Sequence, residues 1–359
     1  MSGVLPNQHI QRMIAEGQIG TGTPLAEGQI QPASLDLRLG TVAHRVRASF
    51  LAGHGRSVED RLQEFEMHRI DLSQGAVLEK GCVYVVPLME DLALPAGISA
   101  VANAKSSTGR LDLLTRTITD GGSEFDRVAE GYTGRLYAEI CPRSFSVLVR
   151  PGMRLNQIRF RSGHAVLSDD ELTALHTSTP LVDGTAMIDD GLGFSVDLKL
   201  PGSTLVGYRA KPHTGVIDLD RIGEYDPRAY WEEVHAENGQ IILDPGAFYI
   251  LVSREAVHIP PDYAAEMAPY LAMVGEFRVH YAGFFDPGFG HDAAGGTGSR
   301  GVLEVRCHEA PFVLEHGQIV GRLVYEKMAE APTQLYGREI KSNYQGQGLK
   351  LSKHFKTPA

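Results

Sequence analysis

The sequence has little positive charge and no long hydrophobic run. Its 34 lysine and arginine residues are outnumbered by 44 aspartate and glutamate residues, which gives a formal net charge of −10. A protein of this sign is repelled by polyanions, so we expect no nonspecific binding to nucleic acid or to anionic membranes. No apolar run approaches the ~18 residues of a membrane-spanning helix. The first residues, MSGVLPNQHIQRM, have no basic segment followed by an apolar one, and we therefore predict a cytoplasmic protein.

Cysteine is also scarce. The three residues, Cys82, Cys141 and Cys307, are an odd number, and none stands in a C-x-x-C pair. The sequence therefore lacks the patterns of a disulfide framework and of a zinc site. We interpret all three as small buried apolar residues, and we predict no metal held by the protein.

Strand patterns are far more frequent than helix patterns. Forty glycines and nineteen prolines interrupt short runs in which apolar and polar residues alternate, namely SLDLRL, CVYVV, RLYAEI, FSVDLKL, FYILV and GRLVYE. Such alternation is typical of antiparallel β-sheet. One helix is predicted at residues 7–17, where Asn7 would cap the first turn and Gly17 would end the last. We expect a mainly β protein with few short helices.

Several segments occur twice and in the same order. PASLDLRLG at 32–40 returns as GFSVDLKLP at 193–201, and GRLYAEICPRSFSVLVRPG at 134–152 matches GVLEVRCHEAPFVLEHG at 301–317. The offset is 161 residues from Asp36 to Asp197, 165 from Pro95 to Pro260 and 165 from Glu139 to Glu304. Chance similarity does not keep order and spacing in this way, so the chain is predicted to be a duplication of one β-rich unit. We assign the first unit to residues 1–170 and the second to residues 171–359.

The two copies differ where chemistry is expected. The first copy carries KSSTGR at 105–110, and the second has no such cluster of hydroxyls with an arginine. The second copy carries HYAGFFDPGFG, with Asp286 at the position where the first copy has Ala129. We infer that each copy has kept a different part of one ancestral site.

The segment NAKSSTGRLD, residues 103–112, follows an apolar strand and brings together backbone N–H groups, hydroxyls and two cations. Such groups bind phosphate when they converge on one place. The alternative is a solvated turn between a strand and a helix, with serine as the cap.

Taken together, IQPASLDLRLG, KSSTGR, the DPGF hairpin with its following VLE, and the tail LYGREIKSNYQGQG resemble the dCTP deaminase branch of the dUTPase-like superfamily. The resemblance covers nearly the whole chain in duplicated form. It implies two tandem distorted β-barrel or jelly-roll units, and it implies sites that form where two units meet.

The resemblance also assigns roles to individual residues. It implies that Lys105, Ser106, Ser107 and Arg110 bind the nucleotide, although the family usually has arginine where Lys105 stands. Asp286 would bind the deoxyribose, Glu304 would act on the water, and the carbonyl of Ala282 would hold that water.

The C-terminal tail would fold over the triphosphate. The residues that the resemblance assigns to this role are Tyr336, Lys341, Tyr344 and Gln347. Asn343 occupies the place of a lysine that the family uses, and Lys341 would substitute for it.

The implied reaction is hydrolysis of dCTP to dUTP and ammonia on the route to dUMP and dTTP. Its chemistry requires a group that takes a proton from water and returns it to the leaving amine. Glu304, or its twin Glu139, is the candidate, and Ser106 and Arg110 would polarise the water. Zinc deaminases carry H-x-E followed by P-C-x-x-C. Here HAE at 235–237 has no such partner, so we expect metal-free activation, with Mg²⁺ entering only on the triphosphate.

Several alternatives stay open at this point. The enzyme could be a dUTPase or a bifunctional deaminase and dUTPase, or the chain could be a noncatalytic nucleotide-binding β-barrel. We expect one composite site per chain, and the competing geometry uses Glu139 in a trimer of first halves. Homo-oligomerisation is compatible with either arrangement.

Overall fold

The computed structural model describes residues 2–269, 277–280, 283–337, 340–341 and 346–357. Its chain divides into two compact units. Unit 1 consists of Met1–Ala165, Gly215–Arg221 and Met328–Thr333, and unit 2 consists of Val166–Thr214, Ile222–Lys327 and Gln334–Ala359. Two short segments from the second half of the sequence thus belong to unit 1. We call Gly215–Arg221 the first strap and Met328–Thr333 the second strap.

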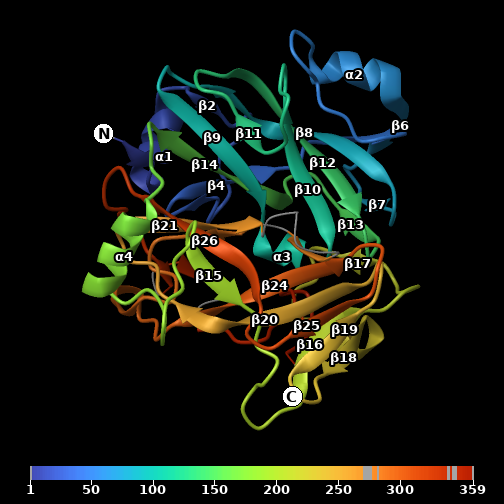
Figure 1. Cartoon of the computed structure of the whole chain (residues 1–359). Coiled ribbons are helices and arrows are strands. Elements are labelled where there is room, and N and C mark those ends of the chain that lie inside the picture. The colour runs from blue at the N-terminus through green and yellow to red at the C-terminus, as the bar shows by residue number, and fades with distance from the viewer. Residues whose placement is uncertain (1, 270–276, 281–282, 338–339, 342–345, 358–359) are drawn as a thin grey trace. The chain divides into compact units, whose positions relative to one another are not determined.

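Unit 1 is built from three sheets whose neighbouring strands are mostly antiparallel (Figure 1). The first has the order β11-β9-β14-β4-β3, with β1 also paired to β14. Its strands are β1 (Gly3–Val4), β3 (Ile30–Gln31), β4 (Ser34–Arg38), β9 (Ile98–Ala104), β11 (Arg127–Val128) and β14 (Arg154–Ser162). The second has the order β10-β12-β8-β5-β6, with β2 paired to β8. Its strands are β2 (Ile19–Gly20), β5 (Val42–Val46), β6 (Glu66–Asp71), β8 (Val83–Ala93), β10 (Leu113–Thr119) and β12 (Thr133–Pro142).

The third sheet of unit 1 includes the first strap. It has the order β17-β13-β7, with strands β7 (Ala76–Leu78), β13 (Val147–Val149) and β17 (Ile217–Asp218). β17 runs parallel to β13 and comes from the strap. Arg150, directly after β13, forms ion pairs with Asp218 at 2.7 Å and with Asp220 at 2.8 Å. The strap therefore completes a sheet that the first half of the sequence leaves at two strands.

A buried polar network links β4 to β8 in unit 1. Glu90 of β8 is 1% exposed, and its carboxylate accepts hydrogen bonds from the Arg38 side chain at 2.7 Å, the Arg38 backbone at 2.8 Å and the Gln29 amide at 2.8 Å. A buried charge is tolerated when it is paired and hydrogen-bonded in this way. Arg38, which lies in the SLDLRL run, thus has a structural role as the partner of the buried Glu90 carboxylate.

The helices of unit 1 are short. The predicted helix is present as α1 (Asn7–Ala15), and Gly17 after it has φ +74°, which suits a residue without Cβ. The predicted cap is wrong, because Pro6 occupies the N-cap position and no side chain bonds there. α2 (Val58–Phe65) was not predicted, although Ser57 and Asp60 form a capping box at its start. α3 (Ser106–Gly109) is a single turn.

Unit 2 contains two larger sheets and two short ribbons (Figure 1). The sheet β15-β26-β21-β23 is formed by β15 (Leu192–Ser195), β21 (Tyr263–Pro269), β23 (Phe284–Phe285) and β26 (Ile319–Lys327). The sheet β18-β16-β20-β24-β22 is formed by β16 (Leu205–Ala210), β18 (Trp231–His235), β20 (Phe248–Val257), β22 (Phe277–His280) and β24 (Ser299–Cys307). The ribbons are β19 (Gln240–Leu243) with β25 (Phe312–Glu315), and β27 (Tyr336–Gly337) with β28 (Ile340–Lys341).

Among the described residues of unit 2, the helical elements are α4 (Asp169–Ser178) and two 3-10 turns, η1 (Pro227–Ala229) and η2 (Asp292–Ala294). α4 spans the boundary at residues 170 and 171 that we assigned between the two copies, and it begins with a capping box of Ser168 and Glu171. Apolar side chains of unit 2 form one large buried cluster that includes Phe194, Leu251, Leu303 and Tyr325.

The two units share one strand order. The series β9-β14-β4 of unit 1 corresponds to β21-β26-β15 of unit 2, and β10-β12-β8-β5 corresponds to β22-β24-β20-β16. The ribbon β7-β13 corresponds to β19-β25. The expectation of a mainly β protein is confirmed, and the matched strands are those that carry the repeated sequence segments.

Candidate functional site

The KSSTGR segment lies directly after β9 in unit 1. Lys105 occupies the N-cap position of α3, and its carbonyl accepts hydrogen bonds from the N–H groups of Thr108 and Gly109 at 2.8 and 2.9 Å. The side chains of Ser107 and Arg110 are buried at 7% and 2% exposure, whereas Ser106 is half-buried. The segment thus forms a turn at the end of a strand, but the alternative of a solvated turn with a serine cap is wrong, because Lys105 occupies the N-cap position and Ser107 and Arg110 are buried.

The segment is fixed from both sides. Lys105 forms an ion pair with Asp36 of β4, which is 1% exposed, and Arg154 lies 3.5 Å from the same carboxylate oxygen. β14 lies between β9 and β4 in the sheet, so the lysine side chain reaches across one strand. On the other side, buried Asp112 adopts φ +53° and accepts a hydrogen bond from Ser144 at 2.6 Å. The sequence showed Asp36 as a repeated residue, but it gave no sign of this pairing.

Glu139 of β12 is engaged by an arginine. The carboxylate is 1% exposed, and the Arg116 guanidinium contacts its Oε1 at 2.5 Å through Nη2 and at 3.1 Å through Nε. Arg116 lies directly opposite Glu139 in the β10–β12 ladder, and its guanidinium stacks on Phe125 at 3.6 Å from the ring centre. Glu139 is therefore the buried half of an ion pair whose arginine side chain is 29% exposed.

Glu304 of β24 has different neighbours in unit 2. It is 6% exposed, and its partners across the ladders are Ile250 of β20 and His280 of β22. His280 thus holds the register position that Arg116 holds in unit 1. Sequence reasoning missed this contrast, although the segments TRTITD and RVHYAG contain it.

The DPGF hairpin of unit 2 follows β23. Asp286 is 7% exposed, and its carbonyl accepts a hydrogen bond from the N–H group of Phe289 at 3.1 Å. Gly288 has φ +93°, and a Cβ there would lie 3.0 Å from the Leu335 side chain. Glycine is therefore needed both for the turn and for the close approach of the tail.

The start of the C-terminal tail is docked on this hairpin. The N–H group of Tyr336 donates to the carbonyl of Pro287 at 2.8 Å, and its ring lies 5.5 Å from that of Phe289. Phe289 in turn makes an edge contact with Phe285 at 5.2 Å. The tail residue and the hairpin thus share one aromatic cluster.

Another predicted tail residue, Gln347, lies along the start of β24. Its N–H group donates to the Ser299 hydroxyl at 3.3 Å, its side-chain amide donates to the Arg300 carbonyl at 3.2 Å, and its carbonyl accepts from the Arg300 N–H group at 3.2 Å. Arg300 also forms an ion pair at 2.5 Å with Asp197, the repeat twin of Asp36. Lys341 is placed on β28 opposite Gly337 of β27. Ala282 and Tyr344 lie outside the described residues.

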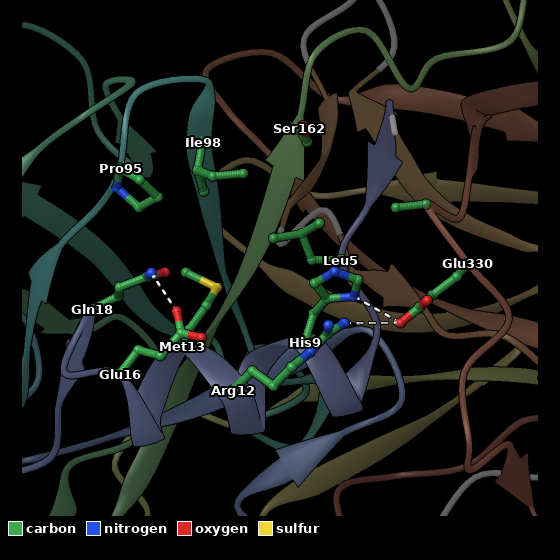
Figure 2. Close-up of a pocket in the computed structure, with 11 residues that line it drawn as sticks. Leu5, His9, Arg12, Met13, Glu16, Gln18, Pro95, Ile98, Ser162 and Glu330 are labelled. Carbon is green, nitrogen blue, oxygen red and sulfur yellow. Dashed lines mark hydrogen bonds and ion pairs between the residues drawn. The ribbon is translucent and has the colours of Figure 1, made fainter.

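A hollow of about 450 Å³ lies in unit 1, and none of the predicted site residues lines it (Figure 2). Its walls include His9 and Arg12 of α1, Ile98 at the start of β9, and Glu330 of the second strap. KSSTGR follows the last residue of β9, and a seven-residue strand spans about 20 Å. The hollow and the KSSTGR segment are thus at opposite ends of one strand.

Two absences concern only the part of the chain that the structure describes. Within it, no group of three or more His, Cys, Asp or Glu side chains is arranged to hold a metal ion. No helix in the same residues has the length and apolar character needed to cross a membrane.

Comparison with known proteins yields one consistent family. The model of the 2'-deoxycytidine 5'-triphosphate deaminase N-terminal domain matches residues 1–164, and that of the C-terminal domain of the same enzyme matches residues 168–355. A protein of Methanothermobacter thermautotrophicus named dCTP deaminase, dUMP-forming, is 31% identical over 195 residues, which are 51% of this chain and 90% of that protein. A dCTP deaminase of Natronomonas pharaonis is 30% identical over 160 residues, 43% of this chain and 74% of that protein.

A solved structure agrees with these matches. The crystal structure of 2'-deoxycytidine 5'-triphosphate deaminase from Agrobacterium tumefaciens is 58% identical in sequence and superimposes with a TM-score of 0.88. The match covers 91% of this chain and 99% of that one. Together with the two domain models, which account for nearly every residue, this likeness shows that the chain belongs to the dCTP deaminase family of hydrolases.

Proposed function

We propose that this protein hydrolyses dCTP to dUTP and ammonia on the route to dUMP and dTTP, with Glu304 as the proton acceptor. The family supports the substrate, and the residues paired with the twin glutamates in their ladders support the choice of residue. Arg116 is paired with Glu139 and binds its carboxylate, and His280 occupies the corresponding register position opposite Glu304. Glu304 also shares its unit with Asp286 and Tyr336. This difference between twins is the observation that carries the proposal.

The residues would divide the chemistry as follows. The Glu304 carboxylate takes a proton from water while the water oxygen bonds to C4 of the base, and N3 receives that proton. The C4–amine bond then breaks, and the same carboxyl group transfers the second proton of the water to the departing ammonia. Ser106 and Arg110 polarise the water and stabilise charge that develops on it.

The remaining predicted residues would bind the nucleotide. Asp286 holds the deoxyribose, and the triphosphate is bound by Lys105 and Ser107 and by the tail residues Tyr336, Lys341, Tyr344 and Gln347. Mg²⁺ accompanies the triphosphate, because a hard cation prefers its oxygens. The carbonyl of Ala282 holds the water. Location in the cytoplasm, one productive site per chain and homo-oligomerisation stay predictions.

The test is direct. Purified protein is incubated with dCTP and Mg²⁺, released ammonia is quantified, and the nucleotides are separated by chromatography. We expect ammonia and dUTP in equal amounts. Binding of dCTP without ammonia release would contradict the proposal and favour a noncatalytic binding protein.

A bifunctional reaction is the second candidate, and one observation favours it. The Methanothermobacter relative is named as dUMP-forming, and dUMP arises from dUTP only if pyrophosphate is also released. The same incubation distinguishes the two, because a bifunctional enzyme yields dUMP and pyrophosphate in step with ammonia.

A further inference from the structure

We propose that Phe355 anchors the C-terminal tail within unit 2 and is a positioning residue for Gln347. The inference deepens the proposed function and rests on it in one respect, because it takes Gln347 to contact dCTP. Phe355, Gln347 and the groups that hold them all belong to unit 2. Every contact that carries the inference thus lies inside one compact unit.

An aromatic cluster of unit 2 surrounds the Phe355 ring, which belongs to a residue of 5% exposure. The ring centre lies 5.5 Å from that of Tyr230, 5.9 Å from that of Trp231 and 6.3 Å from that of Tyr225. All three contacts are edge-on, and edge-on packing at such separations is favourable for aromatic rings. The cluster therefore holds the ring in one place.

Backbone contacts fix the chain on both sides of this ring. Phe355 forms a parallel bridge with Tyr225. The N–H group of Tyr225 donates to the carbonyl of His354 at 3.2 Å, and the N–H group of Lys356 donates to the carbonyl of Tyr225 at 2.9 Å. Residues 354–356 are thus paired in the manner of a short strand.

Gln347 precedes this anchor and is bonded to the start of β24. Its hydrogen bonds to Ser299 and Arg300 are 3.2 to 3.3 Å long, which is the weak end of the usual range. Each such bond contributes modestly against the conformational entropy of a chain segment. A second attachment close by therefore strengthens the docking of Gln347.

The β24 side of these bonds is fixed independently of the tail. Arg300 is paired with Ala256 of β20 in the ladder, and its guanidinium forms the ion pair with Asp197 at 2.5 Å. Asp197 is 4% exposed and also accepts a hydrogen bond from the N–H group of Lys199 at 3.0 Å. Movement of Gln347 is therefore determined by the tail and not by the strand to which it is bonded.

The anchor limits how far Gln347 can move. Gln347 precedes Phe355 by eight residues, and Leu351, four residues after Gln347, is already buried at 5% exposure. Four extended residues span at most about 14 Å. If the anchor opened, docking of Gln347 would also cost the conformational entropy of the segment that follows it.

The experiment compares Phe355→Ala and the milder Phe355→Leu with a control variant, Phe65→Ala. Leucine keeps part of the buried apolar volume, so Phe355→Leu will fold even if Phe355→Ala proves too disruptive. Phe65 also packs against another ring, that of Phe50 at 5.6 Å, but both belong to unit 1. Hydrogen exchange is measured without ligand at the amides of Gln347 and Arg300, with α4 of unit 2 as the internal reference. The constants kcat and KM are measured with dCTP.

We expect exchange at Gln347 and Arg300 to accelerate about tenfold in Phe355→Ala and less in Phe355→Leu, with exchange in α4 unchanged. KM for dCTP should rise about three- to tenfold while kcat stays within about twofold of the wild type. The control should match the wild type in every measurement. Unchanged exchange at Gln347 and Arg300 would overturn the proposal. Acceleration that extends equally to α4 would also overturn it, because it would mark a general loss of stability in unit 2.

A double variant isolates the part played by Gln347. If Phe355 acts through Gln347, then Phe355→Ala should raise KM by less than about twofold when Gln347 is already alanine. The same rise in KM in both backgrounds would contradict the positioning role. If the wild type itself releases no ammonia, the proposed function fails, and the exchange rates alone then decide whether Phe355 positions Gln347.

Discussion

Single residues distinguish two units that share one strand order. Arg116 and His280 occupy the same place in their ladders, opposite Glu139 and Glu304. The arginine forms a partly buried ion pair with its glutamate. The sequence predicted both glutamates as candidates from the repeat, but it did not reveal the arginine, because a partner across a ladder depends on strand register and not on neighbours in sequence.

Loss of Arg116 should destabilise unit 1. Arg116→Met leaves the Glu139 carboxylate buried at 1% exposure without its counter-charge, which costs about 3–5 kcal/mol. Thermal unfolding measures the effect. The double variant Arg116→Met with Glu139→Leu should recover most of the loss, because it removes the stranded charge. Arg135→Ala breaks an exposed pair with Glu59 and should cost no more than about 1 kcal/mol.

Arg110→Lys should fold and lose most of its deaminase activity. The side chain is 2% exposed, and an ammonium cannot reproduce the planar fork of a guanidinium. Ammonia release from dCTP measures the loss, and Arg127→Lys, at an exposed position of β11, serves as the control. Near-normal kinetics in Arg110→Lys would remove this residue from the mechanism.

The sequence predicted most strands but missed two helices and both straps, and each outcome has a physical reason. Alternation located most strands because one face of each strand is buried. α2 and α4 were missed although their capping boxes are visible as SVED and SDDE. The straps could not be predicted, since β17 gains its place only by pairing with a strand about 70 residues earlier in the chain. Local pattern contains no information on such a partner.

The first strap should weaken at acid pH. Its hydrogen bond to Arg150 lowers the pKa of Asp218 below the ordinary value of 3.8. Because the unfolded chain takes up the proton first as pH falls, the stabilisation is fully present above that value and is lost as pH falls through the lower folded pKa. The difference in unfolding temperature between wild type and Asp218→Asn should therefore be clear at about pH 6 and should shrink towards about pH 3. An undiminished difference at the lower pH would contradict this role of the ion pair.

At the scale of the whole molecule, the repeat in the sequence corresponds to two units with the same strand order but different residues of interest. Unit 1 carries KSSTGR, and unit 2 carries the DPGF hairpin and the start of the tail. The repeat was visible from the sequence because it keeps order and spacing. The two straps, which belong to unit 1 although they come from the second half of the sequence, were not visible from the sequence. They are short and have no counterpart in the first copy. We propose that the two copies have specialised and that only one glutamate performs the reaction.

Ammonia release from dCTP, measured for Glu304→Gln and Glu139→Gln, distinguishes the roles of the two glutamates. Glutamine keeps the shape of the side chain but cannot accept the proton of water. We predict that Glu304→Gln loses about 100- to 10,000-fold in turnover while it still binds dCTP. Glu139→Gln should keep most of its turnover. An inactive Glu139→Gln beside an active Glu304→Gln would reverse the assignment, and two active variants would contradict a glutamate-based deamination altogether.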